Sequence, residues 1–254
     1  MITNKLKISW QMSWKLSWKK GIAALIPNSC ALCRLDSSDV VCSACHASYF
    51  KVKQLRCLQC ALPLPPASAS PRCGDCLSNP PAFDRTVSVC DYAAPQDQLI
   101  LSLKFAHQLA LAPWFARMLR DSILQQQGHE LPDLLCAVPL GKDRLAERGF
   151  NQAWEITRPL AKHLGIAANM HLLQRSRNTV MQSSLPNAAR ARNVKNAFCV
   201  DDSLQESLRG MHVGIVDDVM TTGMTLHEIA TMLKRYGAAK VTAYVFARTL
   251  PHIH

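Results

Sequence analysis

Short apolar runs alternate with longer amphipathic stretches along the last two thirds of the chain. Residues 86–90 and 134–138 have the length and apolar content of buried strands, and Pro139 ends the second. Apolar positions recur with helical spacing in three stretches, 96–105, 109–127 and 151–164. Strands that alternate with helices pair in parallel, so the pattern from Asp84 onward predicts an α/β fold with a mostly parallel sheet flanked by helices.

The most informative strand is predicted over residues 211–216, a short and nearly uncharged apolar run. Two carboxylates, Asp217 and Asp218, follow it, and after a Thr/Gly-rich turn a helix is predicted over residues 226–236. In this order of strand, loop and helix, the loop amides and Thr hydroxyls point towards the positive end of the helix dipole. The arrangement favours a bound phosphate.

The two carboxylates need a different ligand, because they would repel a phosphate placed against them. A strand-end acid suits the hydroxyls of a ribose, and it can also hold Mg²⁺ beside a polyphosphate. A capping box offers a ligand-free explanation of Thr225 and Glu228. It leaves Asp217, Asp218 and Gly223 unexplained, so the sequence favours a sugar-phosphate site.

Basic residues gather where another strand passes to a helix. Residues 140–150 are predicted to form a loop at this point, and Gly149 favours a shaped turn. Sheets of α/β proteins bind ligands at such a position. The candidate anion-binding residues are Lys142, Arg144 and Arg148. A solvated basic surface explains each of them, taken singly, equally well.

The stretch between Glu155 and Asp201 contains no acidic residue. Its middle, residues 176–196, has weak periodicity and many polar positions, which predicts a mobile loop. The basic residues assigned to this loop are Arg175, Arg177, Arg190, Arg192 and Lys195. Such a loop can close over a sugar diphosphate and neutralise pyrophosphate, or it can hold the backbone of single-stranded DNA, and the sequence does not choose between these roles.

Eight of the eleven cysteines fall in four Cys-x-x-Cys pairs. The pairs are Cys30 with Cys33, Cys42 with Cys45, Cys57 with Cys60, and Cys73 with Cys76. A tetrahedral Zn²⁺ takes four thiolates, so eight cysteines match two structural Cys₄ sites, whereas a thioredoxin-type redox site needs a single pair. The first two pairs and the last two pairs give the simplest assignment, and an interleaved assignment is the alternative. The remaining cysteines, Cys90, Cys136 and Cys199, lie in apolar runs and are expected to pack in the core.

Trp10, Trp14 and Trp18 recur every four residues in a lysine-rich N-terminal extension, residues 1–27. As a helix, the extension would present an apolar stripe that docks on the domain or contacts a membrane surface, and a frayed tail is the alternative. The chain therefore divides into this extension, a double zinc ribbon over 28–83 and a larger domain over 84–254.

The net charge of the chain indicates which class of partner it binds. A formal net charge of +11 and a pI near 9.3 favour a polyanion such as nucleic acid or a phosphorylated metabolite. A hydrophobic content of 48% supplies a core and excludes a disordered chain. No apolar run is long enough to cross a membrane, and paired cysteines of this kind suit metal better than disulfides. We therefore expect a cytoplasmic protein.

The strand, the acid pair and the TTGMT turn resemble the phosphoribosyl pyrophosphate (PRPP) binding motif of type I phosphoribosyltransferases. The resemblance implies that Asp217 and Asp218 hold the ribose, with Mg²⁺ as an accompanying ion, and that residues 140–150 form the pyrophosphate loop. It assigns the 5′-phosphate to Thr221, Thr222, Gly223 and Thr225.

Longer strings extend this resemblance to a family. RGFNQA at 148–153, RNTVMQSSL at 177–185, RARNVKNAF at 190–198 and the CDY…LKF segment at 90–105, together with the cysteine pairs, resemble the ComF/GntX family over about residues 28–250. That family implies a type I phosphoribosyltransferase-like fold with a small N-terminal double zinc ribbon. It also implies a role in DNA uptake during natural competence, or in the use of external DNA as a nutrient, beside the proteins of the uptake machinery.

The motifs and the family resemblance indicate two candidate functions. The first is a DNA-handling protein that binds PRPP and single-stranded DNA, and the second is an active phosphoribosyltransferase of nucleotide or base metabolism with an unknown acceptor. An isolated nucleic-acid-binding zinc protein would leave Asp217 and Asp218 unexplained. The sequence shows no acceptor-base pocket, so it favours the first function and leaves open whether the chain is an enzyme.

Overall fold

The computed structural model describes residues 28–51, 54–126, 128–175 and 197–251. The chain forms two compact units, with the boundary after Lys51. The first unit contains the first cluster of cysteines, Cys30, Cys33, Cys42 and Cys45, and the second unit contains the second cluster, Cys57, Cys60, Cys73 and Cys76. The double zinc ribbon predicted over 28–83 contains both clusters, and this boundary falls between them.

The described part of the first unit is a small hairpin followed by a helix. Strand β1 (Asn28–Ser29) pairs antiparallel with β2 (Asp36–Ser37), and α2 (Ser43–Phe50) follows. Cys30, Val41 and Cys45 are the buried residues among those described in this unit. A segment with so little apolar core depends on its cysteine cluster for stability.

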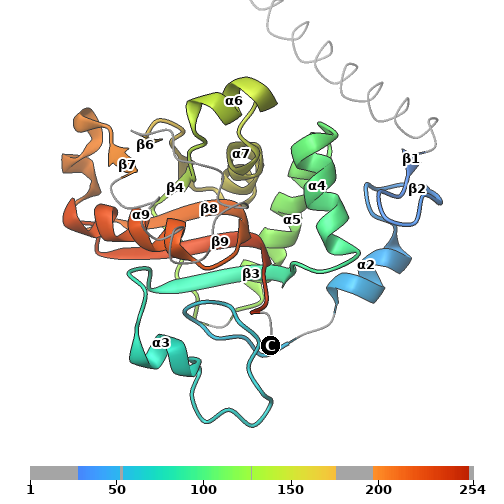
Figure 1. Cartoon of the computed structure of the whole chain (residues 1–254), viewed down its shortest axis with the longest axis horizontal. Helices are drawn as coiled ribbons and strands as arrows, with labels where there is room; N and C mark the ends of the chain where they lie inside the picture. The colour runs from blue at the N-terminus through green and yellow to red at the C-terminus, as the bar shows by residue number, and fades with distance from the viewer. Residues whose placement is uncertain (1–27, 52–53, 127, 176–196, 252–254) are drawn as a thin grey trace, which may run out of the picture. The chain divides into compact units, whose positions relative to one another are not determined.

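The second unit is built on a parallel sheet of five strands in the order β3-β9-β8-β4-β5 (Figure 1). The strands are β3 (Arg85–Asp91), β4 (Leu134–Ala137), β5 (Ala167–Ala168), β8 (His212–Met220) and β9 (Lys240–Arg248). Strand β8 lies in the middle of the sheet, so both of its neighbours hold it in register. Its partner β4 pairs with residues 213–216, and β9 continues the pairing through Asp217 to Met220 at the carboxyl end.

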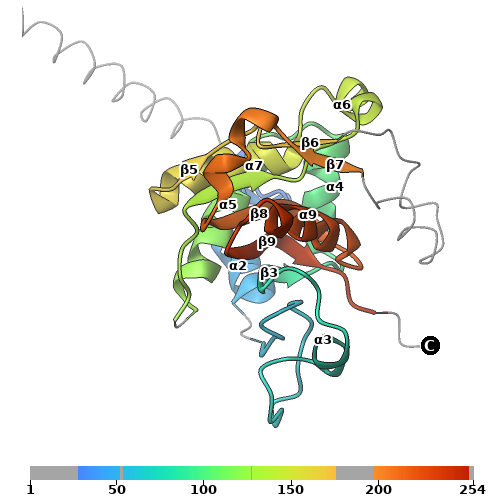
Figure 2. The same ribbon diagram turned by 90° about the vertical axis from the view of Figure 1, so that its left-hand side faces the viewer.

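Helices lie on both faces of the sheet (Figure 2). They are α4 (Gln96–Phe105), α5 (Leu111–Leu124), α6 (Lys142–Arg148), α7 (Gln152–Leu164) and α9 (Met224–Arg235), with the short α3 (Gly74–Ser78) near the second cluster and the 3₁₀ turns η2 (Asp202–Leu204) and η3 (Glu206–Leu208) before β8. A separate hairpin pairs β6 (Leu173–Arg175) with β7 (Phe198–Val200). None of the described helices is long and apolar enough to cross a membrane.

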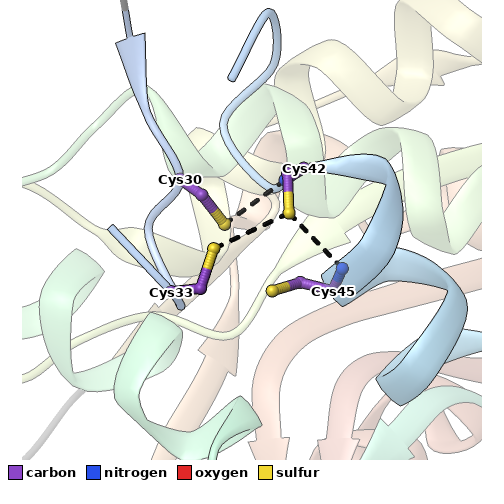
Figure 3. Close-up of side chains that lie close together, drawn as sticks. All are labelled: Cys30, Cys33, Cys42 and Cys45. Atoms are coloured by element: carbon purple, nitrogen blue, oxygen red, sulfur yellow. Dashed lines mark hydrogen bonds between the residues drawn. The ribbon is translucent and has the colours of Figure 1, made fainter. Parts of the chain in front are cut away.

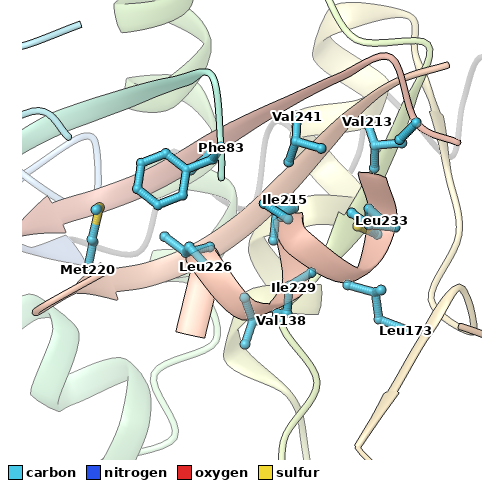
Figure 4. Packing of buried hydrophobic residues seen from close by; sticks show 14 of the residues in the cluster. Phe83, Val138, Leu173, Val213, Ile215, Met220, Leu226, Ile229, Leu233 and Val241 are labelled. Carbon is cyan, nitrogen blue, oxygen red and sulfur yellow. The ribbon is translucent and has the colours of Figure 1, made fainter. Parts of the chain in front are cut away.

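Alternate residues of the central strands supply the two layers of the core. On one face, Ile215 and Val241 pack with Ile229 and Leu233 of α9 (Figure 4). On the other face, the ring of Phe246 stacks on that of Phe115 from α5, with centroids 3.7 Å apart. This period of two along β8 and β9 is what a sheet covered by helices on both sides requires.

The predicted α/β fold with a mostly parallel sheet is confirmed, but three local predictions were wrong or incomplete. Residues 142–148 form helix α6 rather than a loop, because the run KDRLAER consists largely of good helix formers, and Gly149 ends the helix with a left-handed φ of 76°. Strand β8 continues through Asp217 and Asp218, which the sequence analysis placed after the strand. Strand β9 was not predicted.

Candidate functional site

The candidate site is centred on the two acids near the carboxyl end of β8. Asp218 is 2% exposed, and its Oδ2 lies 2.6 Å from the Nζ of Lys104, the penultimate residue of α4. Its Oδ1 accepts a hydrogen bond from Val219 N at 3.0 Å, while Asp217 Oδ1 accepts one from Asp218 N at 2.8 Å. The acids are thus held by backbone donors and by one cation.

Asp217 differs from its neighbour, because the side chains of successive strand residues point to opposite sides. Burial of its carboxyl and the negative charge of Asp218 raise the pKa of Asp217 well above its ordinary value, and Lys104 only partly offsets this. Hydroxyl donors would stabilise the ionised form of such a carboxylate. A ribose offers donors of this kind.

Arg148, at the end of α6, brings a second cation to the acids. Its guanidinium is half-buried and donates to Gln152 Oε1 of α7. Burial lowers the pKa of Arg148, and the charge of Asp218 opposes that change, so the two groups are close enough to interact. Of the other predicted anion-binding residues, Lys142 is exposed and Arg144 is half-buried on the same helix.

The loop after β8 turns into α9 through Gly223, whose φ is 82°. The backbone angle favours glycine, and a Cβ at this position would lie 2.6 Å from Met220 Cε, the flexible end of a side chain that would have to move. Thr222 Oγ1 accepts a hydrogen bond from Met224 N at 3.4 Å, and both Thr221 and Thr222 are exposed.

The capping-box alternative for Thr225 is wrong in the structure. Helix α9 begins at Met224, ahead of Thr225, and its N-cap is Gly223, which supplies no side-chain cap. The positive end of a helix of 12 residues therefore faces the exposed Thr loop.

Arg248, the last residue of β9, supports this loop through hydrogen bonds to its backbone. It is 5% exposed, and its guanidinium donates to the carbonyl oxygens of Cys60 at 2.9 Å, Met220 at 3.1 Å and Thr249 at 2.7 Å, and also to that of Thr221. A single buried side chain thus ties the Thr loop to the second cluster. The sequence analysis did not identify it.

Each cysteine cluster brings four sulfur atoms within 4.8 Å of one another. Figure 3 shows the first cluster, in which Cys33 Sγ and Cys42 Sγ are 3.8 Å apart. The corresponding separation between Cys60 Sγ and Cys73 Sγ in the second cluster is 3.5 Å. Zinc–thiolate bonds of about 2.3 Å place the sulfurs of a tetrahedral site about 3.8 Å apart, so both clusters fit one zinc ion each. The grouping follows the sequential assignment and excludes the interleaved one.

Backbone donors prepare one sulfur in each cluster to be a thiolate. Burial alone would raise the pKa of Cys30, but N–H groups of Cys42, Cys33 and Leu32 outweigh it and lower the pKa to about 6. Burial would also raise the pKa of Cys57, but backbone N–H donors outweigh it and lower the pKa to about 7. Burial raises the pKa of Cys45 to about 12, so a bound cation is needed before all four thiols ionise.

The second cluster is attached to the edge of the sheet. Thr86 Oγ1 of β3 donates to Gln59 O at 2.6 Å, and Gln59 Nε2 donates to Phe83 O at 3.2 Å. Arg56 forms an ion pair with Asp91 at 2.7 Å. Metal binding at this cluster is therefore expected to stabilise the sheet domain as well as the cluster itself.

Comparison with known proteins agrees with this architecture. A family model described as the phosphoribosyl transferase domain matches residues 152–250. The DNA utilization protein YhgH of Salmonella typhimurium is 41% identical over 231 residues, which is 89% of this chain and 99% of that protein. The chain belongs to the ComF family.

Two further ComF relatives are named for competence. Competence protein F of Haemophilus influenzae is 34% identical over 180 residues, covering 69% of this chain and 78% of that protein. Competence protein ComFC of Bacillus subtilis is 28% identical over 229 residues, covering 86% and 88%. The predicted membership of the ComF family is thereby confirmed.

Solved structures with lower similarity include an adenine phosphoribosyltransferase and a glutamine PRPP amidotransferase. Adenine phosphoribosyltransferase of Thermoanaerobacter pseudethanolicus is 17% identical, with a TM-score of 0.34, over 58% of this chain and 83% of that one. Glutamine PRPP amidotransferase of B. subtilis is 20% identical, with a TM-score of 0.35, over 53% of this chain, and the match spans 25% of that enzyme's length. The fold of this ComF protein is that of a type I phosphoribosyltransferase.

Some site residues predicted for this ComF protein lie elsewhere or outside the described residues. Arg175 ends strand β6, where its guanidinium carbon lies 5.5 Å from the centre of the Phe198 ring. Arg177, Arg190, Arg192, Lys195 and the Trp-rich extension fall outside the described residues. Of the three cysteines expected in the core, Cys90 and Cys136 are buried and Cys199 is partly exposed. Lys104 was missed, although it lies within the LKF segment that carried part of the family resemblance.

Proposed function

We propose that this protein acts in the uptake of DNA or in its use as a nutrient, and that it binds PRPP or a related sugar phosphate at the acidic pair. The observation that carries the proposal is the acid pair Asp217 and Asp218 near the carboxyl end of the central strand, followed by the Thr loop and paired through Asp218 with Lys104. The relatives named for DNA utilization and competence support the biological role.

Each part of the site matches one part of PRPP. Asp217 and Asp218 accept hydrogen bonds from the ribose hydroxyls, and Mg²⁺ accompanies the pyrophosphate. Residues 221–225 receive the 5′-phosphate at the start of α9, where backbone amides and the helix dipole favour an anion. Lys142, Arg144 and Arg148 neutralise the pyrophosphate.

Single-stranded DNA is the second proposed ligand. The net charge of +11 supplies affinity for its backbone. The basic residues Arg175, Arg177, Arg190, Arg192 and Lys195 remain the predicted contacts of the segment around 176–196. In this role the protein works in the cytoplasm with proteins of the DNA-uptake machinery, and two structural zinc ions, one for each cysteine cluster, hold its N-terminal part.

A second candidate function is phosphoribosyl transfer to an acceptor. A cavity of about 500 Å³ beside the Thr loop favours it; the cavity reaches Cys60 and Cys76 of the second cluster, and neither acid lines it. Its lining combines apolar side chains with polar ones and includes Phe83, Met220, Thr222, His227 and Arg248. In this function the acceptor attacks C1 of the ribose and pyrophosphate leaves, with Lys104 and Arg148 stabilising the developing negative charge.

A binding experiment separates these proposals. Calorimetry of the zinc-loaded protein with PRPP and Mg²⁺ should show one site, which the Asp217→Asn, Asp218→Asn double variant lacks while it keeps a normal circular dichroism spectrum. Retention of full affinity by that variant would rule out the ribose assignment. Steady release of pyrophosphate on addition of a nucleobase would favour transfer, and PRPP binding without release would favour the non-catalytic role.

A further inference from the structure

Aromatic side chains lie beside Arg148, one of the cations of the acidic site. Phe105, the last residue of α4, is 67% exposed, and the guanidinium carbon of Arg148 lies 5.5 Å from the centre of its ring. The imidazole of His107, two residues further on, packs edge-on against the ring of Phe150, with centroids 5.6 Å apart. Two planar pairs thus join the segment after α4 to the segment at the end of α6.

The position of these pairs is fixed by the site itself. Lys104, which binds Asp218, directly precedes Phe105 in the chain. Arg148 interacts with the charge of Asp218 and stacks on Phe105. The aromatic groups therefore border the proposed ribose site and do not form an independent patch elsewhere on the surface.

Packing within the fold does not account for the exposure of the Phe105 ring. Phe105 is the most exposed of the phenylalanines among the described residues, although Leu103, two positions earlier on the same helix, is buried. A single exposed apolar residue is ordinary, but two phenylalanines, an imidazole and a guanidinium at one place form a set of flat surfaces. Flat aromatic and guanidinium groups beside cations are the recognised means of binding single-stranded nucleic acid, because every base has a face that stacks.

We propose that Phe105, His107, Arg148 and Phe150 form a stacking platform for a base of single-stranded DNA. The inference rests on the proposed function, and it identifies where in the fold a base is held. The open surface of Phe105 takes the base, and Arg144, one turn before Arg148 on α6, meets a neighbouring phosphate. The alternative ligand of an exposed aromatic patch, an apolar protein surface, would not need these cations.

The test uses the full-length zinc-loaded protein and two fluorescent oligonucleotides of equal length, one of thymidines and one with abasic sites at every position. We expect the wild type to prefer the thymidine oligonucleotide. Phe105→Ala should weaken its binding by roughly fivefold to a hundredfold, in line with the loss of one stacked base. Binding of the abasic oligonucleotide should stay unchanged.

Two conservative variants and one control make the result specific. Phe105→Tyr keeps the ring and should keep the affinity, whereas Phe105→Leu keeps apolar bulk and should lose it. Leu124, which is 64% exposed at the end of α5, gives a matched loss of exposed apolar surface in Leu124→Ala, and no effect is expected.

The outcomes distinguish this inference from the proposed function. Unchanged thymidine affinity in Phe105→Ala, or equal losses for both oligonucleotides, would overturn the platform while leaving DNA binding in place. Failure of the wild type to bind either oligonucleotide would overturn DNA binding itself, and the platform with it.

Discussion

The Nζ atom of Lys104 lies 2.6 Å from Oδ2 of Asp218, an acid that is 2% exposed. The two residues are more than a hundred positions apart in the sequence, and they join α4 to the centre of the sheet. A buried carboxylate without a counter-ion is costly, so the lysine holds the Asp218 side chain in place before any ligand arrives. The carboxylate is therefore available to accept hydrogen bonds from a ribose.

Replacing Lys104 tests this role. Lys104→Met should lower the free energy of unfolding by about 1–3 kcal/mol in urea denaturation, because it leaves a buried charge unpaired. Adding Asp218→Asn should restore most of the loss, and the double-mutant cycle measures the coupling. Lys234→Met is the control, since its pair with Asp84 is more exposed on both sides and should contribute less than about 1 kcal/mol. Equal losses in Lys104→Met and Lys234→Met would contradict the interpretation.

The Asp217 carboxyl is expected to lower the free energy of unfolding at neutral pH. Its folded-state pKa is raised, so the carboxyl stabilises the fold fully below its unfolded pKa of about 3.9, and this contribution is lost as the pH rises through the folded pKa. Asp217→Asn should therefore raise the Tm at pH 7 by roughly 2–4 °C, the shift given by about 1 kcal/mol in a domain of this size, while abolishing PRPP binding. Asp202→Asn, at an exposed position, should change neither quantity. A lower Tm for Asp217→Asn would show that its ionised form stabilises the fold.

The parts of the site that the sequence predicted are local in the chain. The strand, the acids, the Thr loop and α9 are consecutive, and each Cys-x-x-Cys pair lies within one turn, so spacing alone was informative. The missing parts are long-range contacts. Lys104 reaches Asp218 from another helix, and Arg248 reaches Cys60 across 188 positions. Neither contact leaves a periodic signal in the sequence, and both depend on how the sheet is ordered.

The two cysteine clusters should respond differently to loss of metal. The protein is expected to carry two zinc ions, and Cys33→Ser and Cys73→Ser should each retain one. Only Cys73→Ser should lower the Tm of the sheet domain, because the second cluster is hydrogen-bonded to β3 and β9 whereas the first belongs to a separate compact unit. Metal analysis and scanning calorimetry measure both effects. Zinc content well below two per wild-type chain would contradict the assignment.

Arg248 should couple the second cluster to the Thr loop. In Arg248→Lys the charge remains, but an ammonium cannot reach all four carbonyl oxygens, so the fold should lose about 1–3 kcal/mol through unsatisfied buried acceptors. Affinity for PRPP should fall as well, since the loop loses its support. The exposed Arg235→Lys serves as the control and should leave calorimetric affinity and stability unchanged. Normal PRPP affinity in Arg248→Lys would show that the loop keeps its geometry without the arginine.

Substitution of Gly223 separates an effect on stability from an effect on PRPP binding. Both Gly223 and Gly165 adopt a left-handed conformation, with φ of 82° and 69°, so alanine at either position should cost about 1 kcal/mol in stability. The surroundings differ, because a Cβ at Gly165 meets nothing within 4 Å whereas one at Gly223 collides with Met220 Cε at 2.6 Å. Gly223→Ala must therefore displace the flexible end of Met220 and strain the turn into α9, and it should lower PRPP affinity by roughly tenfold in calorimetry, which corresponds to about 1.4 kcal/mol. Gly165→Ala should bind PRPP like the wild type, and an equally small effect of both substitutions would show that the left-handed glycine at 223 does not set the affinity for PRPP.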